Sequence, residues 1–342
     1  MKKLGKEAYT VGWICALPRP EWQASRLLFD GDEHENVPLG SSTHFQYAFG
    51  TMNGHNIVMG CLPDTQMGYA SAAAVASEMR ATFHSLRFAV LVGVGGGVPS
   101  EAHDIRLGDV VVSRPNDAER HGGVIQYDYG KAVHNGEFLH TGMLNKPPDV
   151  LLSALGKARA ARPRTSMFAD YLKTYEQWKE DEPAYSTPPK VDRLFKPEYL
   201  HPPQEPTCRN CDLQHEIQRP PRSPSGPIVH FGTIASGNQV MKDAAKRDAI
   251  SKEQHDILCF EMEAAGLMNH FPCLVIRGIC DYCDSHKNKA WQPLAAAAAA
   301  AWTKELLRNI ASADVSIGDT ILQMSHQSKP QRRACVAILT AC

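Results

Sequence analysis

Apolar and polar positions along the chain predict buried strands that alternate with helices. Apolar runs at 9–17 (YTVGWICAL), 56–63 (NIVMGCLP) and 88–99 (FAVLVGVGGGVP) have the character of strands. Between the second and third runs, residues 67–83 are rich in small residues and favour a helix. Strands separated by helical patterns indicate a mixed or parallel sheet covered by helices on both faces, which is an α/β fold.

The same pattern continues along the chain and is interrupted once. Strands are predicted at 105–113, 122–130, 228–237, 256–260 and 272–280, with helices near 150–161 and 291–310 and a polar helix after residue 237. Residues 162–227 crowd prolines and charges, so we expect a Pro-rich, partly ordered insertion within one domain at 9–311. The polar residues 312–342 predict a C-terminal tail.

The charge balance argues against nucleic acid and membranes as partners. The formal net charge is -1, and no long block of Lys and Arg could bind a phosphate backbone. No apolar run is long enough to span a bilayer. Several of the ten cysteines lie in strand-like segments, as small hydrophobic residues do in a reducing compartment. We therefore expect a cytoplasmic protein without a disulfide framework.

The glycine-rich stretch 93–97 (GVGGG) follows a strong apolar strand and would let a ligand approach backbone N–H groups. It is not a dinucleotide fingerprint, because Val98 stands where the third glycine belongs, and no Gly-Lys-Ser/Thr follows as in a P-loop. From these residues alone, a ligand-binding loop and a plain strand-to-loop turn are both open.

Asp281 stands just beyond the predicted strand 272–280, at the end of the sheet where open α/β proteins bind their ligands. A partly desolvated carboxyl group there can act as a general acid, although a loop or capping aspartate is the alternative. Asp284 is an equally good candidate for the residue that caps a helix here. Lys287 and Lys289 are expected to be solvated.

Two glutamates, Glu261 and Glu263, interrupt an otherwise apolar segment (CFEMEAAGLMNHF). On a regular helix they would point about 200° apart, so both could not face one pocket. Because the preceding residues predict a strand, we place both at a strand-to-helix junction, where the helix dipole favours anions. The two glutamates either contact a ligand there or have no role beyond their place on the first turn of the helix.

The pair Cys208 and Cys211 forms a C-x-x-C motif with His201 and His215 nearby. A zinc site is conceivable, but the histidines lack a regular partner spacing. We therefore expect unliganded thiols and no metal site.

Six motifs in this order resemble the nucleoside phosphorylase superfamily: ICALP, VGVGGGVP, IRLGDVVVS, IASGNQVMKD, FEMEAAGLM and VIRGICDYCDSHKNK. The resemblance covers 9–310 apart from the insertion. It is strongest to fungal nucleoside phosphorylase-like domains found beside signalling modules, and more distant to methylthioadenosine/S-adenosylhomocysteine nucleosidase. It implies a mixed, partly barrel-like sheet flanked by helices, cleavage of the N-glycosidic bond of purine nucleosides, a homo-oligomer, and no metal or redox cofactor.

The resemblance also implies roles for individual residues. Glu263 would bind the ribose hydroxyls and Met262 would pack on the sugar, with Glu261 supporting both. Asp281 would protonate the purine N7, and Arg277 would hold the network of water and carboxylates. The sugar and nucleophile site would be lined by Val94, Gly95, Gly96 and Ser236.

The nucleophile is inferred from departures from the phosphorylase pattern. Phosphorylases of the superfamily carry an arginine two residues before the first glycine and a serine after it, and these positions are Leu91 and Val94. Hydrolases of the family activate water with a glutamate in the first strand-to-helix loop. Glu21 is the candidate, one residue later than the pattern, and Arg19 in the same loop keeps phosphate binding open.

We therefore predict a purine ribonucleoside hydrolase with Asp281 as general acid and Glu21 as base. A phosphate-dependent phosphorylase and a non-catalytic nucleoside-binding sensor are the alternatives.

Overall fold

The computed structural model describes residues 1–40, 43–116, 121–134, 137–161, 165–189, 191–205, 207–223, 225–254, 256–312, 315, 320–321 and 323. The strands are β1 (Val11–Cys15), β2 (Tyr47–Met52), β3 (His55–Cys61), β4 (Phe88–Gly97), β5 (Val110–Ser113), β6 (Val124–Gln126), β7 (Gly130–Ala132), β8 (Phe138–His140), β9 (Val229–Ser236), β10 (Ile257–Glu261) and β11 (Cys273–Asp281). The helices are α1 (Gln23–Arg26), α2 (Tyr69–Thr82), α3 (Asp149–Ala160), α4 (Phe168–Lys173), α5 (Ala244–Glu253) and α6 (Gln292–Arg308).

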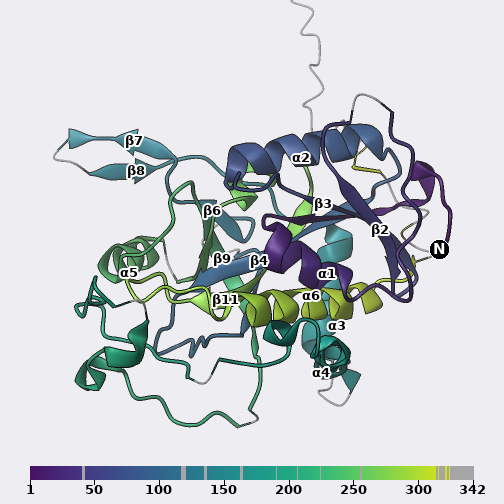
Figure 1. Ribbon diagram of the computed structural model, residues 1–342. Coiled ribbons are helices and arrows are strands. Elements are labelled where there is room, and N and C mark those ends of the chain that lie inside the picture. Colours follow the sequence, from purple (N-terminus) through teal and green to yellow (C-terminus); the bar gives the residue numbers. More distant parts are fainter. Residues whose placement is uncertain are drawn as a thin grey trace, which may run out of the picture.

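The described part of the chain forms a nine-stranded mixed sheet that closes on itself in the middle (Figure 1). The order β10-β9-β5-β11-β4 is completed by pairing of β10 with β4, so these strands make a ring. From β4 the sheet continues as an open wing in the order β1, β3, β2. Strands β7 and β8 form a separate hairpin that projects from the body (Figure 1). The structure thus confirms the mixed, partly barrel-like sheet.

Helices cover the sheet on both sides, as the pattern predicts. The small-residue helix α2 lies on one side, and α6 runs beneath β11 and β4 with α3 and α4 beside it (Figure 1). The alanines of α6 at 295–301 are all buried, which lets this helix approach the sheet closely. At the contact, a Cβ atom on Gly278 of β11 would collide with the backbone oxygen of Ala295. Both small-residue surfaces are therefore needed for the packing.

The described part of the predicted insertion, 162–227, packs against the body. Its buried tyrosines Tyr175 and Tyr185 donate hydrogen bonds to the backbone oxygens of Ala24 and Pro20, at 2.9 and 3.2 Å. Of the predicted tail at 312–342, most residues lie outside the described part. Among those described, Ile321 is buried and its N–H donates to the Leu86 oxygen at 2.8 Å.

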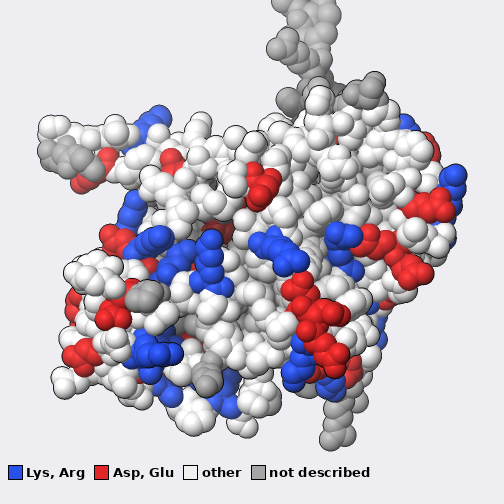
Figure 2. Space-filling model, in the orientation of Figure 1, with Lys and Arg blue, Asp and Glu red and all other residues white. Residues whose placement is uncertain are grey.

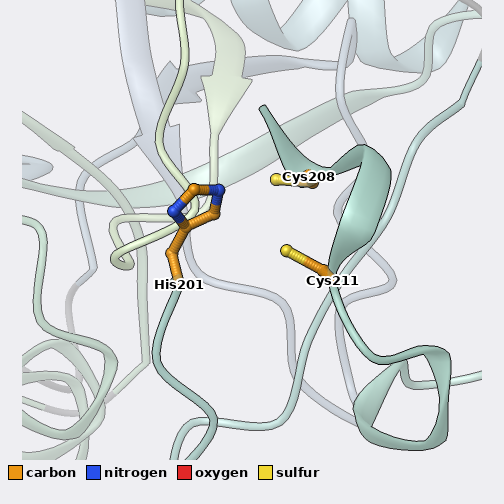
Figure 3. Close-up of side chains that lie close together, drawn as sticks. All are labelled: His201, Cys208 and Cys211. Carbon is orange, nitrogen blue, oxygen red and sulfur yellow. The ribbon is translucent and has the colours of Figure 1, made fainter. Parts of the chain in front are cut away.

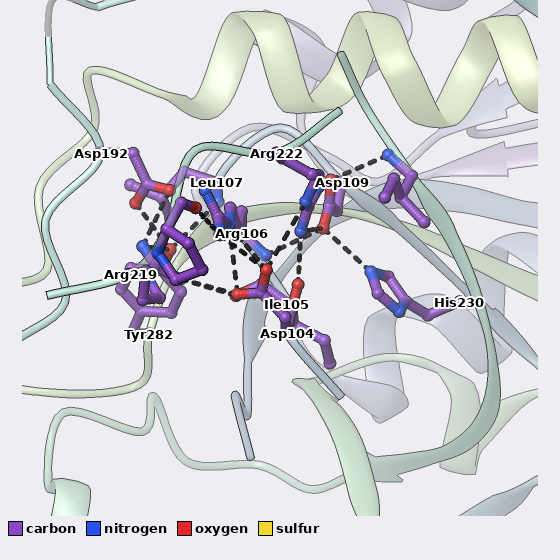
Figure 4. Close-up of polar contacts among 12 residues, drawn as sticks. Asp104, Ile105, Arg106, Leu107, Asp109, Asp192, Arg219, Arg222, His230 and Tyr282 are labelled. Atoms are coloured by element: carbon purple, nitrogen blue, oxygen red, sulfur yellow. Dashed lines mark hydrogen bonds and ion pairs between the residues drawn. The ribbon is translucent and has the colours of Figure 1, made fainter. Parts of the chain in front are cut away.

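An arginine-rich network attaches the end of the insertion to the ring (Figure 4). Arg222 donates to both carboxylate oxygens of the buried Asp109, at 2.7 and 2.9 Å. Arg219 bonds Asp192 and the hydroxyl of Tyr282, both at 2.9 Å. Because Tyr282 directly follows β11, the network connects the insertion to the end of that strand.

The outer surface visible in Figure 2 carries Lys and Arg side chains interspersed with Asp and Glu, without a continuous field of one sign. None of the helices among the described residues combines the length and apolarity that crossing a bilayer requires.

The contact between α6 and β11 generates a stability prediction. Gly278→Ala should lower the free energy of unfolding by about 1–3 kcal/mol or more, because the new methyl group meets backbone rather than a movable side chain. Gly156→Ala is the matched control, because Gly156 is exposed within α3 with open space around it and should gain about 0.5–1 kcal/mol. Urea unfolding measures both, and equal effects would contradict the close packing.

Candidate functional site

A buried arginine gathers three glutamates inside the ring. Arg277, in the middle of β11, is fully buried, and its guanidinium bonds the carboxylate of Glu261. The same Nη2 atom lies 3.0 Å from Oε2 of Glu263, and Nη1 lies 3.9 Å from Oε1 of Glu21. All three carboxylates are buried as well. The structure therefore brings together three of the predicted catalytic and binding residues around Arg277.

Glu261 and Glu263 lie at the end of β10, where the strand changes into a short helical turn, η9 (Ala264–Gly266). The Glu261 carboxylate accepts hydrogen bonds from the N–H groups of Glu263 and Ala264 at 3.1 Å, so it closes this turn. Glu263 accepts from the Gly68 N–H at 3.2 Å. The predicted junction is confirmed, and both carboxylates face the same guanidinium because no regular helix separates them.

Glu21 is fixed by backbone donors. It belongs to the helical turn η2 (Pro18–Trp22) after β1, and its carboxylate accepts from the N–H groups of Ala16 at 2.7 Å, Leu17 at 2.9 Å and Val94 at 2.8 Å. Burial raises the pKa of Glu21, while Arg277 and these donors limit the rise. The carboxylate therefore has one orientation and a perturbed proton affinity.

Charge is unevenly shared in this cluster. Burial raises the pKa of Glu263 to about 7, although Arg277 opposes the shift. Burial by itself would lower the pKa of Arg277, but the neighbouring carboxylates raise it above its ordinary value, so the guanidinium stays charged. One cation thus faces three acidic groups, and a proton on Glu263 relieves part of the excess negative charge.

Asp281 forms a second centre at the end of β11. It is buried, and its carboxylate accepts from the Cys283 N–H at 3.0 Å and from Nζ of Lys287 at 2.6 Å. The expectation that Lys287 is solvated is wrong, because its side chain is only 25% exposed and pairs with Asp281. Burial lowers the pKa of Lys287, but Asp281 raises it more, so the ammonium group stays charged.

The glycines at 93–97 belong to β4, so the expectation of a loop or a strand-to-loop turn is wrong. A Cβ atom on Gly93 would collide with Arg277 and Glu21, and one on Gly96 would lie 2.7 Å from Oδ1 of Asp281. In the pairing of β4 with β11, Gly93 is opposite Arg277 and Gly96 is opposite Asp281. The two centres therefore lie along one pair of strands. Gly93 and Gly96 are three residues apart on β4, which corresponds to about 10 Å along the strand.

The other predicted residues take various places around these centres. Ser236, at the end of β9, is buried and its Oγ accepts from the Ala265 N–H at 2.9 Å, which ties it to the glutamate turn. Met262 is half-buried between the two glutamates. Leu91 is fully buried in the apolar core. Arg19 is exposed and pairs with Glu182 of the insertion at 3.1 Å.

A separate cluster of possible metal ligands lies in the insertion. The donor atoms of His201, Cys208 and Cys211 are all within 4.8 Å of one another.

Comparisons with known proteins agree with the fold. Residues 10–308 match the model of the phosphorylase superfamily, and the chain belongs to this superfamily. A nucleotide-binding leucine-rich repeat (NLR)-like protein from Hyaloscypha variabilis is 42% identical over 306 residues, which are 89% of this chain and 30% of that protein. The ATP nucleosidase Cap17 of Escherichia coli is 37% identical over 91 residues, 25% of this chain and 18% of Cap17. The chain thus spans less than a third of the length of these curated relatives.

Solved structures share the fold at low sequence identity. The 5′-methylthioadenosine/S-adenosylhomocysteine nucleosidase of Neisseria meningitidis, in complex with methylthio-immucillin-A, has a TM-score of 0.55 at 17% identity over 88% of this chain and 99% of its own. Futalosine hydrolase of Helicobacter pylori has a TM-score of 0.54 at 16% identity, over 89% of this chain and 99% of its own. The family model confirms the superfamily that the motifs predicted, and these likenesses confirm the fold class.

Arg277 should control stability in a pH-dependent way. Arg277→Met leaves buried carboxylates without their cation and should cost about 3–5 kcal/mol of unfolding free energy near neutral pH. The cost should shrink as pH falls, because the orphaned glutamates then take up protons. Urea unfolding between mildly acidic and neutral pH measures this.

Lys173→Met is the control for that experiment. It removes an exposed ion pair with Asp170 and should cost less than about 1 kcal/mol at either pH. A loss in Arg277→Met that does not change with pH would contradict the assignment of the buried charges.

Proposed function

We propose that the protein is a purine ribonucleoside hydrolase that releases free base and ribose. The observation that carries the proposal is the position of Glu21, a buried carboxylate fixed by three backbone N–H groups beside Arg277. A base with a raised proton affinity in a fixed orientation is suited to take a proton from an attacking water. The family match and the nucleosidases among the relatives support this class of reaction.

The ribose is proposed to bind at the glutamate centre. Glu263 would accept hydrogen bonds from the ribose hydroxyls, and Met262 would pack against the sugar. Glu261 bonds both the Glu263 N–H and Arg277, so it would hold Glu263 in place. The excess of negative charge around Arg277 would stabilise the cationic sugar that forms as the glycosidic bond breaks.

The purine is proposed to lie toward Asp281. The spacing of the two centres along β4, about 10 Å, matches the length of a nucleoside from sugar to base. Glu21 would take a proton from water, the water oxygen would bond to the anomeric carbon, and the bond from that carbon to the base would break. Asp281, after taking up a proton from solvent, would give it to N7 of the leaving purine, and the ammonium of Lys287, 2.6 Å away, would pair with the carboxylate that remains.

Water is favoured over phosphate as the nucleophile. Leu91 is buried in the core, and the Val94 N–H is already bonded to Glu21, so neither position presents a free donor to a phosphate dianion. Arg19 is bound to Glu182 on the exterior. A phosphorylase is therefore the weaker alternative.

A non-catalytic nucleoside-binding sensor is the second candidate. It is favoured by the NLR-like relative, of which this chain spans only 30%. For the whole protein we propose a cytoplasmic location and a homo-oligomer, with a purine nucleoside or nucleotide as ligand in either case.

Product analysis by chromatography tests the proposal. Adenosine, inosine, guanosine and their 5′-monophosphates should yield free base and ribose in phosphate-free buffer. Asp281→Asn should lower kcat by about 10²–10⁴-fold, because an amide cannot donate the proton to N7. Asp149→Asn, at an exposed carboxylate of α3, should leave the rate unchanged. Product that appears only with phosphate would establish the phosphorylase, and binding without any product would establish the sensor.

The raised pKa of Glu263 gives nucleoside binding a pH dependence. The ionised carboxylate is a stronger acceptor of hydrogen bonds from the ribose hydroxyls than the protonated group, so affinity should rise as pH increases through about 7. Glu263→Gln should abolish this rise and weaken binding by about 1.5–3 kcal/mol. Calorimetry with adenosine in an Asp281→Asn background measures both. If the affinity of the variant that keeps Glu263 does not change with pH, Glu263 does not bind the ribose as proposed.

A further inference from the structure

The insertion carries a cluster of thiols and imidazole that the proposed reaction does not use. Cys208 begins the helical turn η7 (Cys208–Asn210), Cys211 follows it, and His201 lies on the segment before it. Their side chains point toward one another (Figure 3), with the donor atoms within 4.8 Å. A tetrahedral zinc ion places its donors about 3.5 Å apart, so side-chain adjustments of about 1 Å would complete the contacts.

A second imidazole lies next to this cluster, although its nitrogens are not among the donor atoms that all lie within 4.8 Å of one another. His286 is only 8% exposed, and both of its ring nitrogens are buried without a hydrogen-bond partner among the described residues. Its ring is 5.4 Å from that of His201, centroid to centroid, and it stacks on Phe195 at 4.2 Å. The Asp284 carboxylate lies 3.7 Å from its Nδ1 atom. A buried imidazole without hydrogen bonds is costly, and a metal ion would satisfy one of its nitrogens.

We propose that His201, Cys208, Cys211 and His286 bind one structural zinc ion. Two thiolates and two imidazoles form a donor set that zinc prefers, and a closed set of four is typical of structural rather than catalytic sites. This reverses the expectation from the sequence, where the spacing of the histidines gave no sign of a site.

The zinc ion would join the insertion to the loop after β11. Three of the ligands belong to the insertion, and His286 belongs to the loop that follows Asp281 and carries Lys287. The His201 N–H already donates to Ser285 Oγ at 2.9 Å, which brings the two segments together. A catalytic benefit from holding this loop next to Asp281 rests on the proposed function. The proposal that zinc binds here does not.

Metal content and spectroscopy test the site without reference to activity. The full chain, purified under reducing conditions with zinc present, should contain about one zinc ion per chain when measured by elemental mass spectrometry. Replacement by cobalt should give the visible bands of a tetrahedral ion and a thiolate-to-metal charge-transfer band. Removal by a chelator should lower Tm, and added zinc should restore it. Protein with no zinc and no cobalt spectrum would overturn the proposal.

Variants separate the ligands from their neighbours. Cys208→Ser and Cys211→Ser should each lose stoichiometric zinc, and His286→Gln should weaken zinc binding by more than roughly tenfold. His215→Gln is the control, because His215 lies in the same insertion but stacks on Tyr199 outside the cluster. An intact mass that shows a disulfide, with no zinc after reduction, would assign the cysteines to redox chemistry instead. Unchanged zinc affinity in His286→Gln would remove that residue from the site.

Discussion

The ion cluster around Arg277 is the constraint on which the interior of the ring depends. Three carboxylates and one guanidinium are buried together, and burying charge is tolerable only when each group is paired or hydrogen-bonded. The backbone meets this demand at three places: the loop after β1 holds Glu21, the turn after β10 holds Glu261, and Gly68 holds Glu263. The glycines of β4 leave room for the charged side chains.

Much of the fold could be predicted because the pattern of apolar residues reports burial directly. The helices at 67–83, 150–161 and 291–310 and the strands around them are present, and the junction at Glu261 and Glu263 follows from an apolar strand that ends in acidic residues. The motif resemblance supplied the superfamily. The composition of β4 was misleading, because glycines usually weaken a strand, whereas here contacts with Arg277 and Asp281 exclude larger residues.

The remaining features of the site depend on contacts that local sequence does not reveal. Lys287 follows Asp281 by six positions in a loop, and neither strand nor helix periodicity relates the two. Strands β9, β10 and β11 all lie between the C-x-x-C motif and His286 in the sequence, so only the folded chain shows His286 beside His201. The same holds for the insertion, whose arginines reach Asp109 and Tyr282 from far along the chain.

The place of β11 in the ring has a consequence for how the protein folds. This strand is the last of the sheet in sequence among the described residues, yet it lies between β4 and β5 and supplies the only guanidinium described within the cluster. Until it arrives, the earlier strands cannot close the ring, and the glutamates lack the cation that makes their burial tolerable. During synthesis, closure of the ring and assembly of the charged site must therefore both wait for β11, and a nascent chain that ends before residue 273 has neither.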